Sequence, residues 1–231
     1  MRLFRWLLWY PFLLALIALL LVQFWYLGHI WYWVDHNPQA TAFMQARLEK
    51  MREKNAQATI RQQWVAYDRI SVHLKRAIVA AEDARFLDHE GFEWEAIQKA
   101  YEKNLKKGRI VAGGSTISQQ LAKNLFLSGE RTWWRKAQEA AITFMIEALM
   151  NKRRILEIYL NVIEWGDGVF GAEAASRYHF GVASAALGPT QAARLAAMVP
   201  SPRRYGPGRE TAYLQRRAEV ILGRMGAARV P

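Results

Sequence analysis

The segment that most constrains this chain is its uncharged N-terminus. Residues 6–34 contain no Asp, Glu, Lys or Arg, and the stretch 7–22 is aliphatic apart from Trp9, Tyr10, Pro11 and Phe12. A helix of about 20 apolar residues can cross a bilayer, and Trp and Tyr at both ends of such a run are typical of membrane interfaces. A cleaved signal peptide is the alternative, but "VQFWYLGHIWYW" offers no good small-residue cleavage site. We therefore expect a cytoplasmic tip and an uncleaved transmembrane anchor over residues 1–34.

The charged residues predict on which side of the membrane the rest of the chain lies and which classes of partner it can bind. Arg2, Arg5 and the amino terminus stay in the cytoplasm by the positive-inside rule, so the residues after Asp35 lie outside. The formal net charge of +12 indicates an anionic partner: nucleic acid, anionic lipid or a phosphorylated substrate. Outside the cytoplasm, nucleic acid is not expected. The absence of Cys excludes disulfides, iron–sulfur clusters and thiolate zinc sites.

Helical patterns dominate the chain beyond the anchor. We read residues 35–62 as a juxtamembrane linker or helix and residues 63–225 as one mainly α-helical domain. Alternating strand patterns are nearly absent, with "GRIVAGG" the one short candidate, and the glycines within 166–171 predict an irregular loop. The expected helix caps are Ser71, Gly108 and Thr116, the last forming a capping-box pattern with Gln119.

Two adjacent acids, Glu82 and Asp83, end an apolar helix in the stretch "AAEDARFLDHEG". A surface exit, with Asp83 capping the next turn, is one interpretation, although an acid at a helix C-terminus opposes the helix dipole. A Glu beside apolar neighbours tends to have a raised pKa, which suits a general base. His89 has no second ligand at metal-binding spacing, so we interpret it as a structural histidine.

Polar and cationic residues follow in two further segments. In "GGSTISQQLAKN", the helix start that Thr116 caps is a candidate anion site, with Lys123 two turns further on; an ordinary well-capped helix is the alternative. In "RTWWRKAQE", the cations precede Glu139 by three and four residues, so they can pair with it. That second cluster is either a solvated salt-bridged face or a cationic pocket with an embedded acid. Trp133 and Trp134 beside it belong either to the core or to the membrane interface.

Four segments in this order, "EDARFLDHEG", "GGSTISQQLAKN", "RKAQE" and "KRRILEIYLN", resemble the successive motifs of the peptidoglycan glycosyltransferases of family 51. The resemblance covers roughly residues 65–205. It implies a mainly α, lysozyme-like domain with a small membrane-associated jaw lobe. We expect a monofunctional member, because the sequence leaves no room after this region for the transpeptidase domain of class A penicillin-binding proteins.

The resemblance also implies a reaction. These enzymes polymerise lipid II: the 4-hydroxyl of the acceptor's GlcNAc attacks the anomeric carbon of the MurNAc at the lipid-pyrophosphate end of the growing chain. A β-1,4 bond forms with inversion, and undecaprenyl pyrophosphate leaves. The implied setting is the outer face of the inner membrane, in cell-wall biogenesis and cell shape, with cell-division or elongation proteins as partners. No organic cofactor is implied, but a divalent cation (Mg²⁺ or Mn²⁺) near Glu139 is expected.

The same motifs imply which residues of this chain have the family's catalytic and binding roles. Glu82 matches the catalytic base, Asp83 the acid that supports it, and Glu139 the second family glutamate, which helps to place the donor pyrophosphate. The implied phosphate ligands are Lys123, Arg131, Arg135 and Lys136, and the implied sugar-cleft residues are Ser115, Thr116, Gln119, Gln120 and Asn124. A pyrophosphate leaves without a proton but needs cations, whereas hydrolytic lysozymes need a general acid. The cations therefore favour transfer over hydrolysis.

Some positions depart from the family pattern, and two other functions compete. Gln191 stands where Glu is expected, Arg194 where an apolar residue is expected, and the stretch 178–184 is irregular; all lie outside the implied catalytic centre. A membrane-bound lytic transglycosylase or muramidase would not need the cationic cluster. A non-catalytic cell-wall scaffold would need neither Glu82 nor Glu139.

Overall fold

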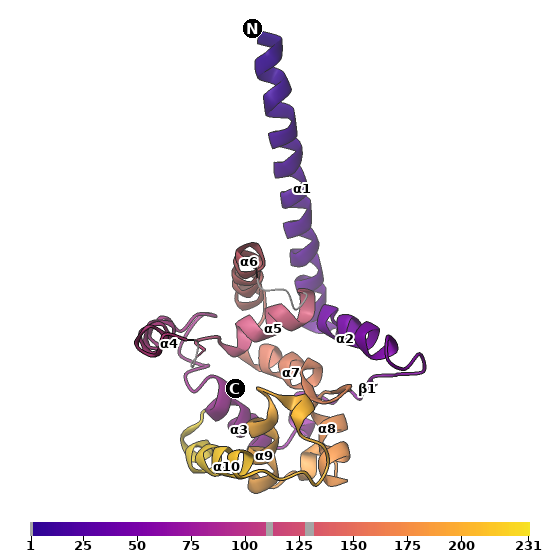
Figure 1. Ribbon diagram of the computed structural model, residues 1–231, viewed down its shortest axis with the longest axis vertical. Coiled ribbons are helices and arrows are strands. Elements are labelled where there is room, and N and C mark those ends of the chain that lie inside the picture. The colour runs from indigo at the N-terminus through magenta and orange to yellow at the C-terminus, as the bar shows by residue number, and fades with distance from the viewer. Residues whose placement is uncertain (1, 110–112, 128–131) are drawn as a thin grey trace. The chain divides into compact units, whose positions relative to one another are not determined.

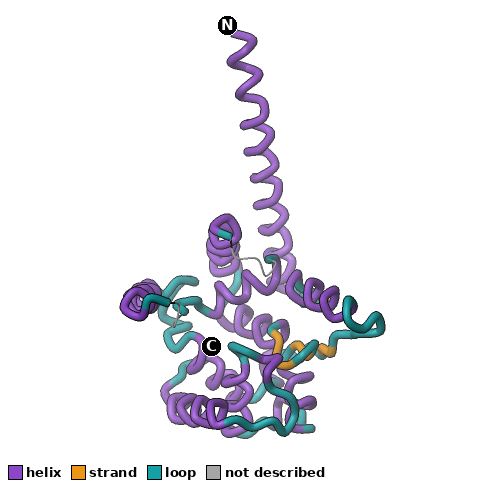
Figure 2. Tube along the Cα trace, viewed as in Figure 1, coloured by secondary structure: helices purple, strands orange, loops and turns teal. Residues whose placement is uncertain are grey.

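Helices account for most of the chain in the computed structural model, which describes residues 2–109, 113–127 and 132–231 (Figures 1 and 2). The chain divides into two compact units, residues 1–37 and 38–231. The α-helices are α1 (Arg2–Asp35), α2 (Ala42–Arg52), α3 (Val72–Glu82), α4 (Trp94–Lys107), α5 (Ile117–Phe126), α6 (Trp133–Leu149), α7 (Lys152–Val162), α8 (Ala172–Phe180), α9 (Pro189–Met198) and α10 (Ala212–Arg224). Three short strands and four 3-10 turns complete the described chain: β1 (Arg61–Gln62), β2 (Glu164–Gly166), β3 (Val169–Phe170), η1 (Tyr67–Arg69), η2 (Ser184–Ala186), η3 (Pro202–Arg204) and η4 (Met225–Ala227).

The first unit is built on the apolar helix α1. Its segment Trp9–Asp35 has a mean hydropathy of 2.0 in its most apolar window and is long enough to cross a membrane. Among the described residues, it is the one helix that meets both conditions. Its large side chains, including Trp25 and Trp31, are mostly exposed. Both properties are consistent with the predicted anchor.

The core of the second unit begins with α3, α9 and α10, which pack against one another (Figure 1). α3 buries Leu74 and Ile78 completely, α9 buries Leu195, and α10 contributes Leu214 and Ile221. The α3 N-cap prediction is confirmed, because Ser71 Oγ accepts a hydrogen bond from the His73 backbone N–H at 3.2 Å. This packing fixes the C-terminal end of α3, where the two adjacent acids lie.

Helix α5 lies against α2, α6 and α7, and its start is fixed by local chemistry. The predicted capping box is confirmed: the Thr116 hydroxyl accepts from the Gln119 N–H, and the Gln119 side chain accepts from the Thr116 N–H. Just before it, a Cβ at Gly114 would lie 2.8 Å from the Ile97 Cα, so only glycine allows this approach to α4. The predicted cap at Gly108 is also confirmed, with φ +61° at the end of α4.

A small sheet of order β1-β3-β2 joins distant parts of the second unit. β1 runs parallel to β3, with Arg61 opposite Val169, and β2 runs antiparallel to β3, with an irregularity between Glu164 and Gly166. The predicted irregular loop at 166–171 therefore contains strand instead. Strands of two or three residues are too short to produce a recognisable alternation of polar and apolar residues. The strand candidate "GRIVAGG" lies partly outside the described residues, because 110–112 are not among them.

Candidate active site

A pocket of about 780 Å³ lies among α2, α5, α7 and the segments 163–167 and 199–204. That volume is typical of sites for small ligands. Its charged lining consists of five cations and two acids: Arg47, Lys123, Arg135, Arg203, Arg204, Glu164 and Asp167. The excess of positive charge suits an anionic ligand.

The pocket gathers four of the residues predicted from the motifs. Gln120, Lys123 and Asn124 lie three and four positions apart on α5, so they share one face of that helix, and Arg135 joins them from α6. Four of the other predicted substrate-binding residues do not line it, namely Ser115, Thr116, Gln119 and Lys136, and neither do the predicted catalytic residues Glu82, Asp83 and Glu139. Arg131 lies outside the described residues.

Thr116 and Gln119 are used to hold the backbone before α5. Besides the capping box, the Thr116 hydroxyl donates to the Gly91 carbonyl at 2.6 Å. Gly91 itself has φ +86°, and a Cβ there would come within 2.8 Å of Thr143 Cγ2. These contacts fix the loop that follows the two acids against α5 and α6.

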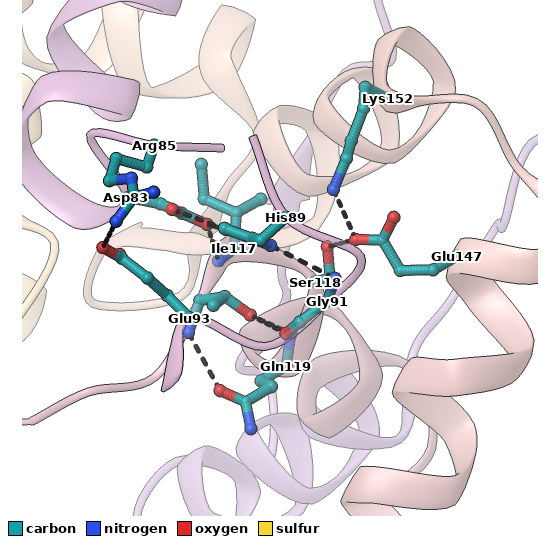
Figure 3. A network of polar contacts seen from close by, with 11 residues as sticks. Asp83, Arg85, His89, Gly91, Glu93, Ile117, Ser118, Gln119, Glu147 and Lys152 are labelled. Atoms are coloured by element: carbon teal, nitrogen blue, oxygen red, sulfur yellow. Dashed lines mark hydrogen bonds and ion pairs between the residues drawn. The ribbon is translucent and has the colours of Figure 1, made fainter. Parts of the chain in front are cut away.

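Asp83 does not line the pocket, and its carboxylate binds the start of α5 (Figure 3). One carboxylate oxygen accepts the Ile117 backbone N–H at 3.0 Å, and both accept from His89 Nε2 at 2.9 and 3.1 Å. His89 Nδ1 accepts the Gly91 N–H at 3.1 Å, so the imidazole proton that donates to Asp83 is on Nε2. The anion at this helix start is thus the chain's own carboxylate, and His89 has the structural role that the sequence predicts.

A second buried cluster ties α5 to α6 and α7 (Figure 3). Glu147 Oε1 accepts from the Ser118 hydroxyl at 2.5 Å and from Lys152 Nζ at 2.7 Å. All three side chains are largely removed from solvent. Part of the polar run in "STISQQ" thus serves packing between helices.

Glu82 points in a different direction from Asp83, toward α5 and α10. Gln120 Nε2 donates to its Oε2 at 3.0 Å, and Arg217 Nη2 lies 3.5 Å from its Oε1. The Tyr159 hydroxyl donates to Gln120 Oε1 at 2.9 Å, which fixes the orientation of that amide. Gln120 and Tyr159 both line the pocket, so Glu82 lies directly behind its wall with 12% of its side chain exposed.

Burial raises the pKa of Glu82, against the opposing effects of the Gln120 hydrogen bond and the positive charges of Arg217 and Lys123; the charge of Asp83 raises it further. Burial, together with the negative charges of Glu82 and Asp83, also raises the pKa of Tyr159 well above its ordinary value. Tyr159 therefore keeps its proton and donates at every working pH. Glu82, with its raised pKa, is therefore a carboxylate suited to accept a proton.

Glu139 is also buried, with 5% of its side chain exposed, but it pairs with cations of its own helix. Arg135 Nη1 donates to Oε2 at 2.8 Å and Lys136 Nζ contacts Oε1, which confirms the predicted pairing. Hard divalent cations need several oxygen ligands, and among the described residues no group of three or more acidic or His side chains gathers. With both of its oxygens held by cations, Glu139 offers no preformed metal site among the described residues, and the expected divalent cation stays a prediction.

Trp133 and Trp134 flank this cluster on the surface. Trp133 is 92% exposed, and Trp134 is exposed as well. Of the two interpretations made from sequence, membership of the core is therefore wrong. Exposed tryptophans of this kind are typical of surfaces that meet a membrane or a partner.

Several pocket residues carry no motif signal and were missed from sequence. Arg47 Nε donates to Glu164 Oε1 at 3.1 Å and its guanidinium also contacts Asp167. Glu164 accepts the Gly168 N–H at 3.3 Å and lies 3.9 Å from Arg203. Burial raises the pKa of Glu164, although the hydrogen bonds and positive charges of these partners act to lower it. The two pairs of Arg47 join residues more than a hundred positions apart, so no local pattern could have found them.

The mainly helical second unit carries two carboxylates, Glu82 and Glu139, beside a cationic pocket, an arrangement suited to proton transfer on an anionic ligand. The sequence profile described as Transglycosylase matches residues 48–226, and the chain belongs to that family. Over 227 residues it is 61% identical to the biosynthetic peptidoglycan transglycosylase of Nitrosospira multiformis, covering 98% of each chain. The protein of the same name from Laribacter hongkongensis is 62% identical over 218 residues, covering 94% of this chain and 96% of that one. The resemblance to the family-51 motifs is thus confirmed.

Proposed function

We propose that this transglycosylase polymerises peptidoglycan from lipid II. The acceptor's GlcNAc 4-hydroxyl attacks the anomeric carbon of the lipid-linked MurNAc, forming a β-1,4 bond with inversion. Undecaprenyl pyrophosphate leaves. The observation that carries the proposal is Glu82, a buried carboxylate held at 3.0 Å by Gln120 of the pocket wall.

Glu82 supplies the base that this reaction needs. Attack by a sugar hydroxyl requires removal of its proton as the new bond forms, and a base is most effective when its pKa approaches the working pH. Burial raises the pKa of Glu82 in that direction. The hydroxyl proton passes to Glu82, and the electron pair of the broken C–O bond leaves with the pyrophosphate, so the step needs no covalent intermediate.

The cations of the pocket suit the leaving group. Lys123 and Arg135 line it together, and Glu139 holds Arg135 in place through its 2.8 Å ion pair. Preorganised positive charge at the place where negative charge develops lowers the barrier without a general acid. In this proposal, Glu139 acts by orienting cations.

The anchor places this chemistry at the membrane. The apolar part of α1 spans the cytoplasmic membrane once, with the N-terminal arginines inside and the catalytic unit outside. A lipid-linked donor is then available without leaving the bilayer. Cell-division or elongation proteins are the partners we propose for this location.

The test is polymerisation of labelled lipid II by the purified full-length protein in detergent, with products separated by length and then digested with muramidase. We expect long, muramidase-sensitive chains from the wild type. Glu82→Gln should retain lipid II binding but polymerise at least about 10²-fold more slowly. Glu102→Gln, which makes the same change at an exposed position of α4, is the matched control.

A second pair of variants tests the cationic pocket. Lys123→Ala should weaken donor use by at least about tenfold, whereas Lys54→Ala, an exposed lysine outside the pocket, should not. Release of fragments from preformed glycan, without polymer, would replace the proposal by a lytic activity. Full polymerisation by Glu82→Gln would remove Glu82 as the base.

A further inference from the structure

The C-terminal helix α10 contributes an arginine to the surroundings of Glu82. The stretch "TAYLQRRAEVILGRM" shows only a helical pattern, yet its Arg217 brings Nη2 to 3.5 Å from Glu82 Oε1. α10 packs on α3, which carries Glu82, and on α9. Among the described residues, Glu82 is the one carboxylate within ion-pair distance of Arg217.

The geometry gives the two oxygens of Glu82 different partners. Oε2 accepts from a neutral amide, Gln120, whose orientation Tyr159 fixes. Oε1 faces the guanidinium of Arg217, whose own Nε is buried without a hydrogen-bond partner in the described part of the chain. Because Glu82 is largely desolvated, a cation at this distance is screened less than one on the surface.

We propose that Arg217 is a positioning residue that keeps Glu82 ionised, and therefore competent as a base, at the working pH. This inference rests on the proposed function of Glu82. Arg217 touches neither the pocket lining nor a reacting atom; it acts through the carboxylate.

The other groups around Glu82 do not replace this effect. Asp83, the residue after α3, is a like charge, so it disfavours ionisation of Glu82, and Tyr159 of α7 stays neutral. Gln120 of α5 stabilises the ionised form as a neutral hydrogen-bond donor. Lys123 of α5 also favours ionisation, but it ranks behind Arg217 and Asp83 in its effect on the pKa of Glu82. Arg217 is thus the cation that most strongly opposes the effect of burial on the pKa of Glu82.

The first experiment measures the pH profile of kcat/KM for lipid II polymerisation with the full-length protein. Arg217→Met keeps the apolar stem but removes the charge. We expect the acidic limb of its profile to move to higher pH, with a loss of roughly tenfold or more at the acidic end and recovery toward the wild-type rate at the alkaline end. Arg217→Lys should restore most of the loss. The matched control is Arg216→Met, its exposed neighbour on α10, which should follow the wild type.

A second experiment needs no turnover. Urea unfolding at pH 8 of the wild type, Arg217→Met, Glu82→Gln and the double variant forms a cycle. We expect Arg217→Met to lower the unfolding midpoint more when Glu82 is present than in the Glu82→Gln background.

The two experiments separate failure of the inference from failure of the proposed function. An equal loss of rate at every pH, or equal shifts of the midpoint in both backgrounds, would overturn the inference and leave Arg217 with a packing role alone. Absence of polymer from the wild type would instead overturn the proposed function. Coupling between the two residues in the unfolding cycle would then still support the electrostatic link.

Discussion

Glu82 and Glu139 are both buried glutamates beside one pocket, yet their charges are balanced in different ways. Glu139 has two cations of its own helix, one on each oxygen. Glu82 has a neutral amide on one oxygen and a more distant arginine, which is 30% exposed, on the other. The comparison shows that burial alone does not decide what a carboxylate does. Glu139 is held by two close ion pairs, whereas Glu82 has a neutral amide and a more distant arginine, and burial raises the pKa of Glu82.

The largest expected difference is in folding stability. Glu139→Gln would leave Arg135 and Lys136 facing a neutral side chain, so we expect the free energy of unfolding at pH 7 to fall by about 2 kcal/mol. Glu82→Gln should cause no such loss. Urea unfolding of both variants at low and high salt tests this, with Glu102→Gln as the control. Equal losses in the two variants would contradict the comparison.

The next effect is on the pH dependence of stability. Because the pKa of Glu82 is raised in the folded protein, the folded state holds this proton more tightly than the unfolded chain. The wild type therefore loses stability as the pH rises above the ordinary carboxyl value of 4.5. Glu82→Gln lacks this loss, so we expect its Tm at pH 8 to exceed the wild-type value by roughly 2–4 °C, the change that about 1 kcal/mol produces.

That difference in Tm should shrink as the pH falls toward 4.5, because both proteins then carry a neutral group. Thermal unfolding followed by circular dichroism between pH 4 and 8 measures it. A gain that is the same at every pH would mean that the substitution acts through packing and not through charge.

The smallest effect concerns the orientation of Gln120. Tyr159→Phe removes the hydroxyl that donates to Gln120 Oε1, so the amide can rotate away from Glu82. We expect about a threefold loss of kcat and a loss of about 0.5 kcal/mol of stability. Steady-state kinetics with lipid II measure the first quantity. Tyr101→Phe, at an exposed position of α4, should change neither, and an unaffected Tyr159→Phe would exclude this orienting role.

Local chemistry in the sequence was enough to predict much of the fold. The caps at Ser71, Gly108 and Thr116 were predictable because each depends on residues within a few positions. The pairing of Glu139 follows from helical spacing in the same way. The strands β1 to β3 were not predictable, because each is only two or three residues long and β1 finds its partner β3 more than a hundred positions away.

The residues of the site were likewise predictable only where local sequence marks them. Its motif residues on α5 and α6 were visible from sequence, since they lie in dense polar and cationic runs. Arg47, Glu164 and Arg217 were not, because no motif marks them in the sequence and each acquires its partner only in the fold. The opposite directions of Glu82 and Asp83 also depend on tertiary contacts with α5 and α10.

The ion pairs of Arg47 have a practical consequence for anyone who shortens this protein for crystallisation or inhibitor screening. α2 supplies Phe43 and Arg47 to the pocket. A fragment that starts at residue 63, where the predicted catalytic domain begins, would lose that wall and leave the buried Glu164 without its nearest cation. A fragment that starts near Pro38 keeps Thr41, whose hydroxyl caps α2 by accepting the Met44 N–H at 3.1 Å. The shortest fragment that keeps this wall of the pocket therefore starts some 25 residues before the predicted catalytic domain.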